Sequence, residues 1–385
     1  MTGKGVGTEV TRDGGRPLVI AFLGDANSIH LRSWVGYFAA RGHRVYVLAP
    51  NGQAIEPGLP SNISIEHFVP YSRNRVRLLG ALEARRSLGS VLSRLAPNVL
   101  HAHYLTIHGW CARLSGFHPY VITVWGSDIL ITARESIRPR LYARLALSAA
   151  DLVTGDSAEL VRAAVAAGAH PNRTVEVQFG VDTVRFSPGP GSDALRQRLG
   201  LVGRRIVFSP RTIAPLYKHE VLLEALAELP EDVSVVMTRH LAQPEHLAFL
   251  ERRTRDLGLS DRVHILPSID HDAMVDAYRI ADVVVSIPST DGTPVTLLEA
   301  MAVGGPIVAS DLPSVREWLG DLDPEVLVPV DDSHATARAL SLVLARSPDR
   351  RAEVAGRGRA LVERRANHEA SMAHVETLYR KLGRP

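Results

Sequence analysis

Residues 282–311 read DVVVSIPSTDGTPVTLLEAMAVGGPIVASD, two apolar runs joined by a turn and a helical segment. The runs at 282–288 and 306–311 are continuously apolar instead of alternating with polar residues. This pattern is typical of parallel strands that are covered on both faces. The stretch therefore predicts a strand–helix–strand unit of an α/β fold.

The turn inside this unit predicts a binding loop. Asp291 and Gly292 form the turn, and Thr293 is expected to be the N-cap of the helix, with Pro294 at its first position. The helix then begins at the carboxyl end of a parallel strand, where its free N–H groups and its dipole favour an anion. The alternative is a plain loop–helix junction in which Glu299, inside the helix, pairs locally.

The same alternation of strand and helix fills the chain on both sides of this unit. Before it, strands are expected at 18–23, 44–49, 98–103, 120–125, 151–155, 175–179, 205–210, 233–237 and 262–267, and after it at 326–330. Helices are expected between them, for example at 30–41 and 78–95. This order predicts two Rossmann-like, doubly wound parallel sheets with a cleft between their carboxyl ends.

The domain limits follow from composition. Residues 1–16 are rich in Gly, Thr and charge and are expected to be a disordered tail. The segment SPGPGSD (187–193) is a plausible hinge, because Pro and Gly disfavour both helix and strand. We therefore expect a first domain at 17–187, a second domain at 188–366, and an exposed, charged helix at 367–385.

Composition excludes several classes of protein. The chain has 385 residues, and 44 Lys and Arg against 41 Asp and Glu leave a net charge of only +3, so nothing points to nucleic acid. The single cysteine excludes an internal disulfide and a CxxC metal site. No apolar run reaches the ~18 residues of a membrane span, and the N-terminus lacks the apolar core of a signal peptide. We expect a cytoplasmic, two-domain protein.

Four stretches carry a resemblance to a known family: FGVDTVRFSP (179–188), SPRTIAPLYKHEVLLEAL (209–226), DRVHILPSIDHDAMVDAYRIADVVVSIPS (261–289) and DGTPVTLLEAMAVGGPIVASD (291–311). Two acidic residues, Asp291 and Glu299, have seven residues between them. In these features the chain resembles the retaining glycosyltransferases of the GT-B fold, glycosyltransferase family 4 (group 1). The resemblance runs from Leu18 to the C-terminus and is more specific in the second half.

The resemblance implies that the second domain holds a nucleotide-sugar. Arg211 and Lys218 match the family's catalytic cations that face the leaving diphosphate, although each alone is also readable as a surface residue. Glu299 matches the carboxylate that accepts the ribose hydroxyls, and Asp291 matches the acidic residue near the donor sugar. The other residues expected at the donor are Gly292, Thr293, Val295 and, in the first domain, Gly24.

The chain departs from the family at three positions that face the sugar or the acceptor. Asp291 stands where Glu is usual, Pro294 where Gly is usual, and Trp125 where His is usual. These differences leave the identity of the sugar open. Candidates on the acceptor side are His103, Trp125 and Asp128, each at a strand end, although for His103 a hydrogen-bonded structural histidine at the strand end is the favoured interpretation.

The sequence thus predicts a retaining transfer of a hexosyl-type residue from a UDP- or GDP-sugar to an acceptor hydroxyl. The acceptor is a surface glycan, a glycolipid or another lipid-linked molecule, or a small molecule such as a natural product. No metal and no cofactor are expected, because Arg211 and Lys218 supply the cations. Two other classes stay open, a GT-B nucleotide-sugar 2-epimerase and a catalytically silent GT-B partner subunit.

The arginine-rich segment at 73–94 permits two interpretations. Its leucines form an apolar face, which indicates a helix that packs on its sheet with a solvated basic side. The alternative is peripheral contact with an anionic membrane.

Overall fold

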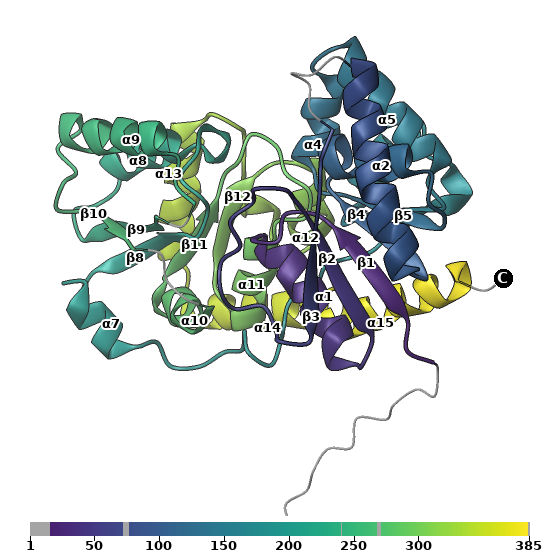
Figure 1. Ribbon diagram of the computed structural model, residues 1–385. Helices are drawn as coiled ribbons and strands as arrows, with labels where there is room; N and C mark the ends of the chain where they lie inside the picture. The colour runs from purple at the N-terminus through teal and green to yellow at the C-terminus, as the bar shows by residue number, and fades with distance from the viewer. Residues whose placement is uncertain (1–15, 72–76, 240, 268–270, 384–385) are drawn as a thin grey trace, which may run out of the picture.

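The computed structural model describes residues 16–71, 77–239, 241–267 and 271–383. The expected tail at 1–16 lies outside these residues except for Arg16, and so do positions 72–76 of the arginine-rich segment. Two parallel sheets form the two domains, as the sequence predicts (Figure 1).

The first sheet has seven strands in the order β3-β2-β1-β4-β5-β6-β7, all parallel. Its strands are β1 Val19–Leu23, β2 Arg44–Pro50, β3 Ile63–Phe68, β4 Val99–His103, β5 Tyr120–Val124, β6 Leu152–Gly155 and β7 Thr174–Glu176. Strand β3 was missed by the sequence analysis. Its sequence ISIEHF mixes polar and apolar residues, as suits a strand at the sheet edge, and so lacks the continuous apolar run of its neighbours.

The second sheet has six parallel strands in the order β10-β9-β8-β11-β12-β13. Its strands are β8 Arg205–Ser209, β9 Val233–Thr238, β10 Val263–Leu266, β11 Val283–Ser286, β12 Ile307–Ser310 and β13 Leu327–Val328. In both sheets the strand order reverses beside the first strand of the domain, and ligands bind at such a point in doubly wound folds.

Helices cover both faces of each sheet. Those of the first half are α1 Ile29–Ala40, α2 Arg77–Leu95, α3 Trp110–Ser115, α4 Ser127–Leu130, α5 Ile137–Ala149 and α6 Ala158–Ala166. Those of the second half are α7 Asp193–Arg198, α8 His219–Ala227, α9 Pro244–Asp256, α10 His271–Ile280, α11 Val295–Val303, α12 Pro313–Leu319, α13 Ser333–Leu344, α14 Pro348–Arg365 and α15 His368–Leu382. Side chains of α2, α3, α5 and α6 form the core on one face of the first sheet, and α1 packs on the other.

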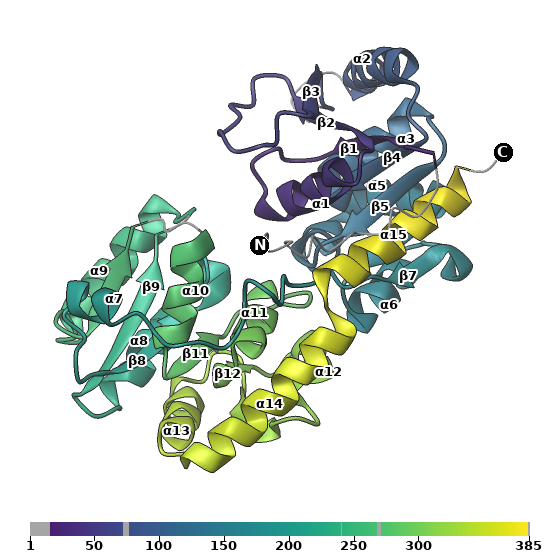
Figure 2. The ribbon, with the colours of Figure 1, turned by 90° about the horizontal axis from the view of Figure 1, so that it is seen from below.

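The last helix corrects an expectation. We expected an exposed helix at 367–385, but Met372, Val375 and Tyr379 of α15 are buried in the core of the first domain beside α1. Figure 2 shows α14 on the second domain and α15 on the first, so that the C-terminal segment runs across both. The reason is an apolar stripe at positions 372, 375 and 379, which the high charge of this segment hides in the sequence.

The chain crosses between the domains earlier than expected. Phe179 packs in the core of the first domain, whereas Val181 and Phe186 pack in the core of the second. The crossing therefore lies near Gly180, and the Pro- and Gly-rich segment at 187–193 belongs to the second domain, where Arg279 donates to the Ser187 carbonyl at 3.0 Å.

Gly180 lies against the other crossing of the chain. The Val181 N–H donates to the Ala366 carbonyl at 2.8 Å, and the His368 N–H donates to the Val181 carbonyl at 3.1 Å. Gly180 has φ +76°, and a Cβ there would lie 2.6 Å from the His368 Cα. Glycine is required because the two crossing segments touch at this point.

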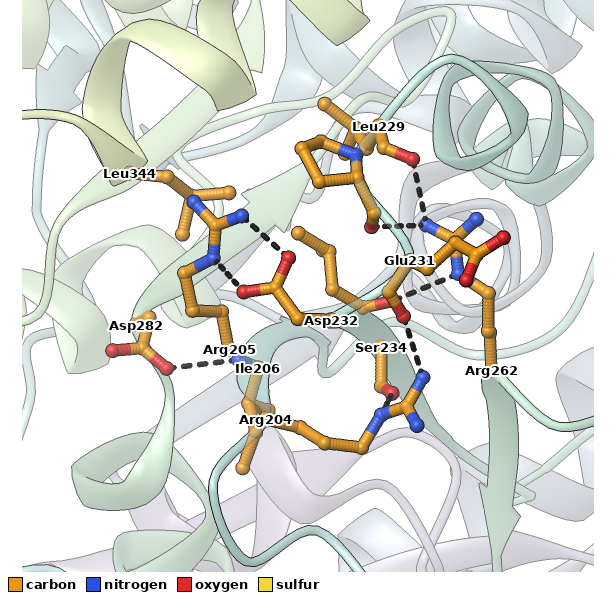
Figure 3. A network of polar contacts seen from close by, with 12 residues as sticks. Arg204, Arg205, Ile206, Leu229, Glu231, Asp232, Ser234, Arg262, Asp282 and Leu344 are labelled. Carbon is orange, nitrogen blue, oxygen red and sulfur yellow. Dashed lines mark hydrogen bonds and ion pairs between the residues drawn. The ribbon is translucent and has the colours of Figure 1, made fainter.

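Polar side chains tie the amino ends of the second sheet's strands together (Figure 3). Arg205 donates two hydrogen bonds of 2.7 Å to Asp232, and Arg204 donates to Ser234 Oγ at 2.7 Å. Asp282 accepts from the Ile206 N–H at 2.8 Å. The contacts of these charged residues hold the strands in place at the edge opposite the cleft.

Candidate active site

A cavity of about 310 Å³ lies between the domains at the carboxyl ends of both sheets. Residues of both domains line it. They include Ile29, His30, Trp125, Ser127, Asp156 and Phe179 from the first half of the chain, and Arg211, Tyr217, Thr238, Tyr278, Asp291, Thr293, Val295, Thr296 and Glu299 from the second. The motifs that the sequence analysis placed at the donor therefore meet the strand ends of the first domain here.

Helix α11 begins one residue later than expected. Pro294 is its N-cap, with extended backbone and no capping side chain, and Val295 is the first helical residue. The expectation that Thr293 caps the helix is wrong, because its hydroxyl donates instead to the Asp156 carbonyl at 2.6 Å. The N–H groups of Val295 and Thr296 have no acceptor among the described residues, and both residues line the cavity. This end of α11 can therefore bind an anion.

Arg211 lies in the cavity wall and is held from three sides. Its Nη2 donates to Asp291 Oδ2 at 2.7 Å and its Nη1 to Thr296 Oγ1 at 3.1 Å. The Tyr217 ring lies under the guanidinium at 4.3 Å. Burial raises the pKa of Asp291, and the charge of Arg211 opposes that rise. These contacts fix the guanidinium before any ligand is bound, which suits it to stabilise charge in a transition state.

Glu299 is held by a tyrosine. The Tyr278 hydroxyl, from α10, donates to Glu299 Oε2 at 2.6 Å. Burial raises the pKa of Glu299 to about 7, although the hydrogen bond from Tyr278 and the charge of Arg211 work against the rise. The Tyr278 ring itself is 1% exposed and packs edge-on against Phe208. The carboxylate can accept further hydrogen bonds at Oε1 from the cavity side.

Lys218 does not line the cavity. Its Nζ forms an ion pair with Asp331 Oδ1 at 2.9 Å. Both residues have left-handed backbone, with φ +53° at Lys218 and +62° at Asp331, a conformation that is rare outside glycine. Lys218 directly follows Tyr217, which does line the cavity, but its ammonium is engaged by the carboxylate of Asp331.

Asp156, at the end of β6, joins the two domains at the site. Its Oδ1 accepts from the Thr293 N–H at 3.0 Å, and its carbonyl accepts from the Thr293 hydroxyl. The carboxyl is 2% exposed, and its burial raises its pKa well above the usual range. Beside it Gly126, with φ +113°, approaches the loop before α11 so closely that a Cβ would lie 2.9 Å from the Gly292 nitrogen. Gly292 thus contacts the first domain and is not among the described residues that line the cavity.

Trp125 forms part of the cavity wall on the side of the first domain. Its ring stacks on Phe179 with 4.2 Å between centroids and lies 4.8 Å from the His30 ring. All three residues line the cavity. The position where the family usually has His is therefore filled by part of an aromatic cluster.

The other two acceptor-side candidates lie behind this wall. Asp128 is buried and accepts from the N–H groups of Leu105, Trp125 and Gly126 at 2.8, 3.0 and 3.1 Å. Burial raises its pKa to about 6, and the backbone N–H groups oppose the rise. Its oxygens hold the Trp125–Gly126 loop.

His103 is 4% exposed and packs edge-on against Trp34. Neither of its ring nitrogens has a hydrogen-bond partner among the described residues. Burial lowers its pKa well below the usual value, so the ring is neutral. Gly24 lies against the same ring, since a Cβ there would be 3.4 Å from His103 Cβ. Neither residue lines the cavity.

The structure thus brings six of the expected residues to the cavity: Trp125, Arg211, Asp291, Thr293, Val295 and Glu299. The sequence analysis missed Asp156 and Tyr278. Asp156 directly follows the predicted strand at 151–155. Its position at a strand end could have indicated it, because the same position indicated His103. Tyr278 lies inside the stretch 261–289 that carries the resemblance, but nothing in a single sequence links its hydroxyl to Glu299.

No group of three or more His, Cys, Asp or Glu side chains in the described ranges could hold a metal ion. The metal independence expected from Arg211 and Lys218 stays a prediction.

Two family models match the two domains. Residues 19–157 match the model described as "Glycosyl transferase 4-like", and residues 192–360 match "Glycosyl transferases group 1". The chain belongs to the group 1 glycosyltransferases and has the GT-B fold, as the resemblance implied.

Relatives and solved structures agree with this assignment. The D-inositol 3-phosphate glycosyltransferases of Geodermatophilus obscurus and Mycolicibacterium smegmatis are both 32% identical, over 270 and 268 residues. In each case the match covers 65% of this chain and 60% of the relative, so the chain spans about three fifths of these relatives' length.

Among solved structures, sucrose-phosphate synthase of Thermosynechococcus elongatus superposes with a TM-score of 0.80 and 21% identity, over 95% of this chain and 99% of that one. HepE of Anabaena in complex with UDP-glucose gives 0.77 and 21%, over 94% and 99%. At these identities the likeness concerns the fold alone.

Proposed function

We propose that the protein is a retaining glycosyltransferase that moves a hexosyl-type residue from a UDP- or GDP-sugar to an acceptor hydroxyl without a metal ion. The observation that carries the proposal is the convergence of Arg211, Glu299 and the free N–H groups of Val295 and Thr296 on one cavity. A cation, a carboxylate and a helix N-terminus are what a nucleoside diphosphate needs around its phosphates and its ribose. The neighbour HepE, solved with UDP-glucose, supports a uridine nucleotide as the first donor to test.

In the proposed reaction the bond between the sugar C1 and the diphosphate oxygen breaks, and the acceptor oxygen bonds to C1 on the same face. The leaving phosphate takes the acceptor's proton. Arg211 and the α11 N-terminus stabilise the negative charge that develops on the diphosphate. Asp291, fixed by its hydrogen bond from Arg211, lies toward the sugar. The hydrogen bond from the Thr293 N–H to Asp156 joins the two domains and so keeps the donor and the acceptor in position for the reaction.

The acceptor binds against the wall formed by Trp125, Phe179 and His30. The inositol phosphate in the relatives' name makes a cyclic polyol the first acceptor to test, beside glycans, lipid-linked sugars and small natural products.

The experiment has two stages. Thermal shift with UDP-glucose, UDP-N-acetylglucosamine and GDP-mannose identifies the donor, since a ligand at 100 times its Kd stabilises a protein by about 2.7 kcal/mol. The donor is then incubated with and without acceptors, and the anomeric configuration of the product is read by NMR. Net retention supports the proposal, and net inversion contradicts it. Conversion of the donor alone into its C2 epimer would identify the epimerase instead, and binding without turnover of any acceptor would favour the silent subunit.

A further inference from the structure

Exposed apolar side chains gather on one side of the first domain. On α5, Ile137, Leu141 and Leu145 are 81%, 50% and 40% exposed. They are four residues apart and therefore form one stripe along the outer face of the helix. On α2, Leu79 and Leu82 are 64% and 41% exposed. A cluster of this kind on a soluble domain marks an interaction surface.

The two helices belong to the same layer. Both pack on the same face of the first sheet, with α3 in contact with each of them. Figure 1 shows α2 and α5 on the side of the first domain away from the second sheet. None of the exposed apolar residues of α2 and α5 lines the cavity of the candidate active site.

Arginines flank the stripe. Arg140 and Arg144 lie along one side of it on α5 and Arg138 along the other, all exposed, and α5 contains no acidic residue. On α2, Arg85 and Arg86 are exposed beside Leu82. An exposed apolar stripe bordered by arginines matches the surface of an anionic bilayer, with acyl chains below and negative head groups above.

A second copy of the chain fits this surface poorly. A two-fold contact would place α5 against α5 and bring like charges together with no acid on either helix to offset them. We therefore infer that the outer face of α5, extended by Leu79, Leu82, Arg85 and Arg86 of α2, docks on an anionic lipid bilayer. The docking surface is thus centred on α5, whereas the sequence analysis considered only the segment 73–94.

No helix in the described ranges is long and apolar enough to span a membrane. Docking is therefore peripheral and reversible, and it does not depend on the proposed reaction.

The test is sedimentation of the full chain with vesicles, without any substrate. We expect the protein to bind vesicles of phosphatidylglycerol and phosphatidylcholine at least tenfold better than vesicles of phosphatidylcholine alone. The pair Ile137→Ser/Leu141→Ser and, separately, the pair Arg140→Glu/Arg144→Glu should each reduce binding at least tenfold. All four side chains are exposed, so the fold should survive, and circular dichroism checks this.

The matched controls lie on the second domain. The pair Val202→Ser/Leu342→Ser likewise replaces two exposed apolar side chains by serine, and Arg252→Glu/Arg255→Glu on α9 makes the same change in charge. Both should leave vesicle binding within twofold. Absence of binding to anionic vesicles overturns the inference, as does equal loss in the controls. Light scattering that shows a dimer which Ile137→Ser/Leu141→Ser dissociates would also overturn it, because the face would then bind a second copy.

Discussion

The Tyr278 hydroxyl donates a 2.6 Å hydrogen bond to Glu299 Oε2, and the two residues come from neighbouring helices, α10 and α11. The bond has two effects on the carboxyl that is proposed to bind the ribose. It fixes the orientation of the group, and it stabilises the ionised form against a burial that raises the pKa to about 7. We therefore propose that Tyr278 is a positioning residue, which acts on the ligand through Glu299.

Removal of this hydroxyl should change the pH dependence of nucleotide binding. In Tyr278→Phe the carboxylate loses a donor, so the pKa of Glu299 rises further above about 7. Because the ionised carboxylate is proposed to bind the ribose, affinity should fall as the pH drops through that pKa, and the variant should lose affinity at a higher pH. We expect the midpoint to move up by about one to two pH units, since a hydrogen bond to a charged group contributes ~1.5–3 kcal/mol and one unit corresponds to ~1.4 kcal/mol.

Calorimetry with UDP between pH 5.5 and 9 measures the midpoint. Tyr217→Phe is the matched control, because it keeps the ring under Arg211 and does not touch Glu299. A midpoint that moves equally in both variants, or in neither, would show that Tyr278 serves only the packing of α10.

The sequence predicted much of this site, for physical reasons. Strand and helix alternate with continuous apolar runs, so the two sheets and their carboxyl edges follow from the local pattern. Arg211, Asp291 and Glu299 were expected at the site because their motifs match those of the family that the chain resembles. Contacts between distant parts of the chain were not predictable. The Asp156–Thr293 bond and the burial of Tyr379 in the first domain each depend on how the two domains meet. The residue pattern within one helix or strand carries no information on how the two domains meet.

Arg211→Ala should slow turnover by about 10²–10³-fold, the usual effect of removing one preorganised charge contact to a transition state. The change also leaves Asp291 buried without its cation, so the melting temperature should fall. The double variant Arg211→Ala/Asp291→Asn should recover the melting temperature and remain slow. Recovery of the rate in the double variant would mean that Arg211 supports only the structure.

Lys218→Ala should separate activity from stability more cleanly. The partner carboxylate of Asp331 is 58% exposed, and exposed ion pairs contribute only about 0–1 kcal/mol, so unfolding should be nearly unchanged. Turnover should fall at least tenfold if the ammonium moves from Asp331 to the diphosphate. Denaturant melts and initial rates on one preparation give both quantities, and a rate within twofold of wild type would remove Lys218 from the catalytic set.

Activity should persist in excess EDTA, because Arg211, Lys218 and the α11 N-terminus are proposed to supply the positive charge that a divalent ion provides in other enzymes. The assay compares initial rates with and without the chelator at saturating donor. A complete loss that added magnesium or manganese restores would contradict metal independence.

Glu299→Gln and Asp291→Asn should have different effects although both remove one carboxylate from the cavity. The amide in Glu299→Gln replaces an acceptor oxygen with a donor, so the side chain can no longer accept from both ribose hydroxyls. We expect UDP affinity to fall by roughly ten- to a hundredfold, from the ~1.5–3 kcal/mol of hydrogen bonds to a charged group. Asp291→Asn should leave UDP affinity within a few-fold and reduce transfer, because Asp291 is proposed to face the sugar.

The melting temperature of Glu299→Gln tests independently whether Glu299 serves binding or the fold, because the direction of its change with pH follows from the pKa of Glu299. The pKa of about 7 in the folded protein lies above the ordinary glutamate pKa of 4.5. Ionisation of Glu299 therefore costs stability at pH above 7, and this cost disappears as the pH falls toward 4.5. The neutral amide of Glu299→Gln does not ionise, so the variant is free of this destabilisation. At pH 8 the variant should therefore melt no lower than wild type while it binds UDP weakly, and the difference in melting temperature should shrink or reverse by pH 5. Weak UDP binding together with a large loss of stability at pH 8 would show that Glu299 is needed for the fold. Equal losses of UDP affinity in Glu299→Gln and Asp291→Asn would show that the ribose and sugar roles are assigned wrongly.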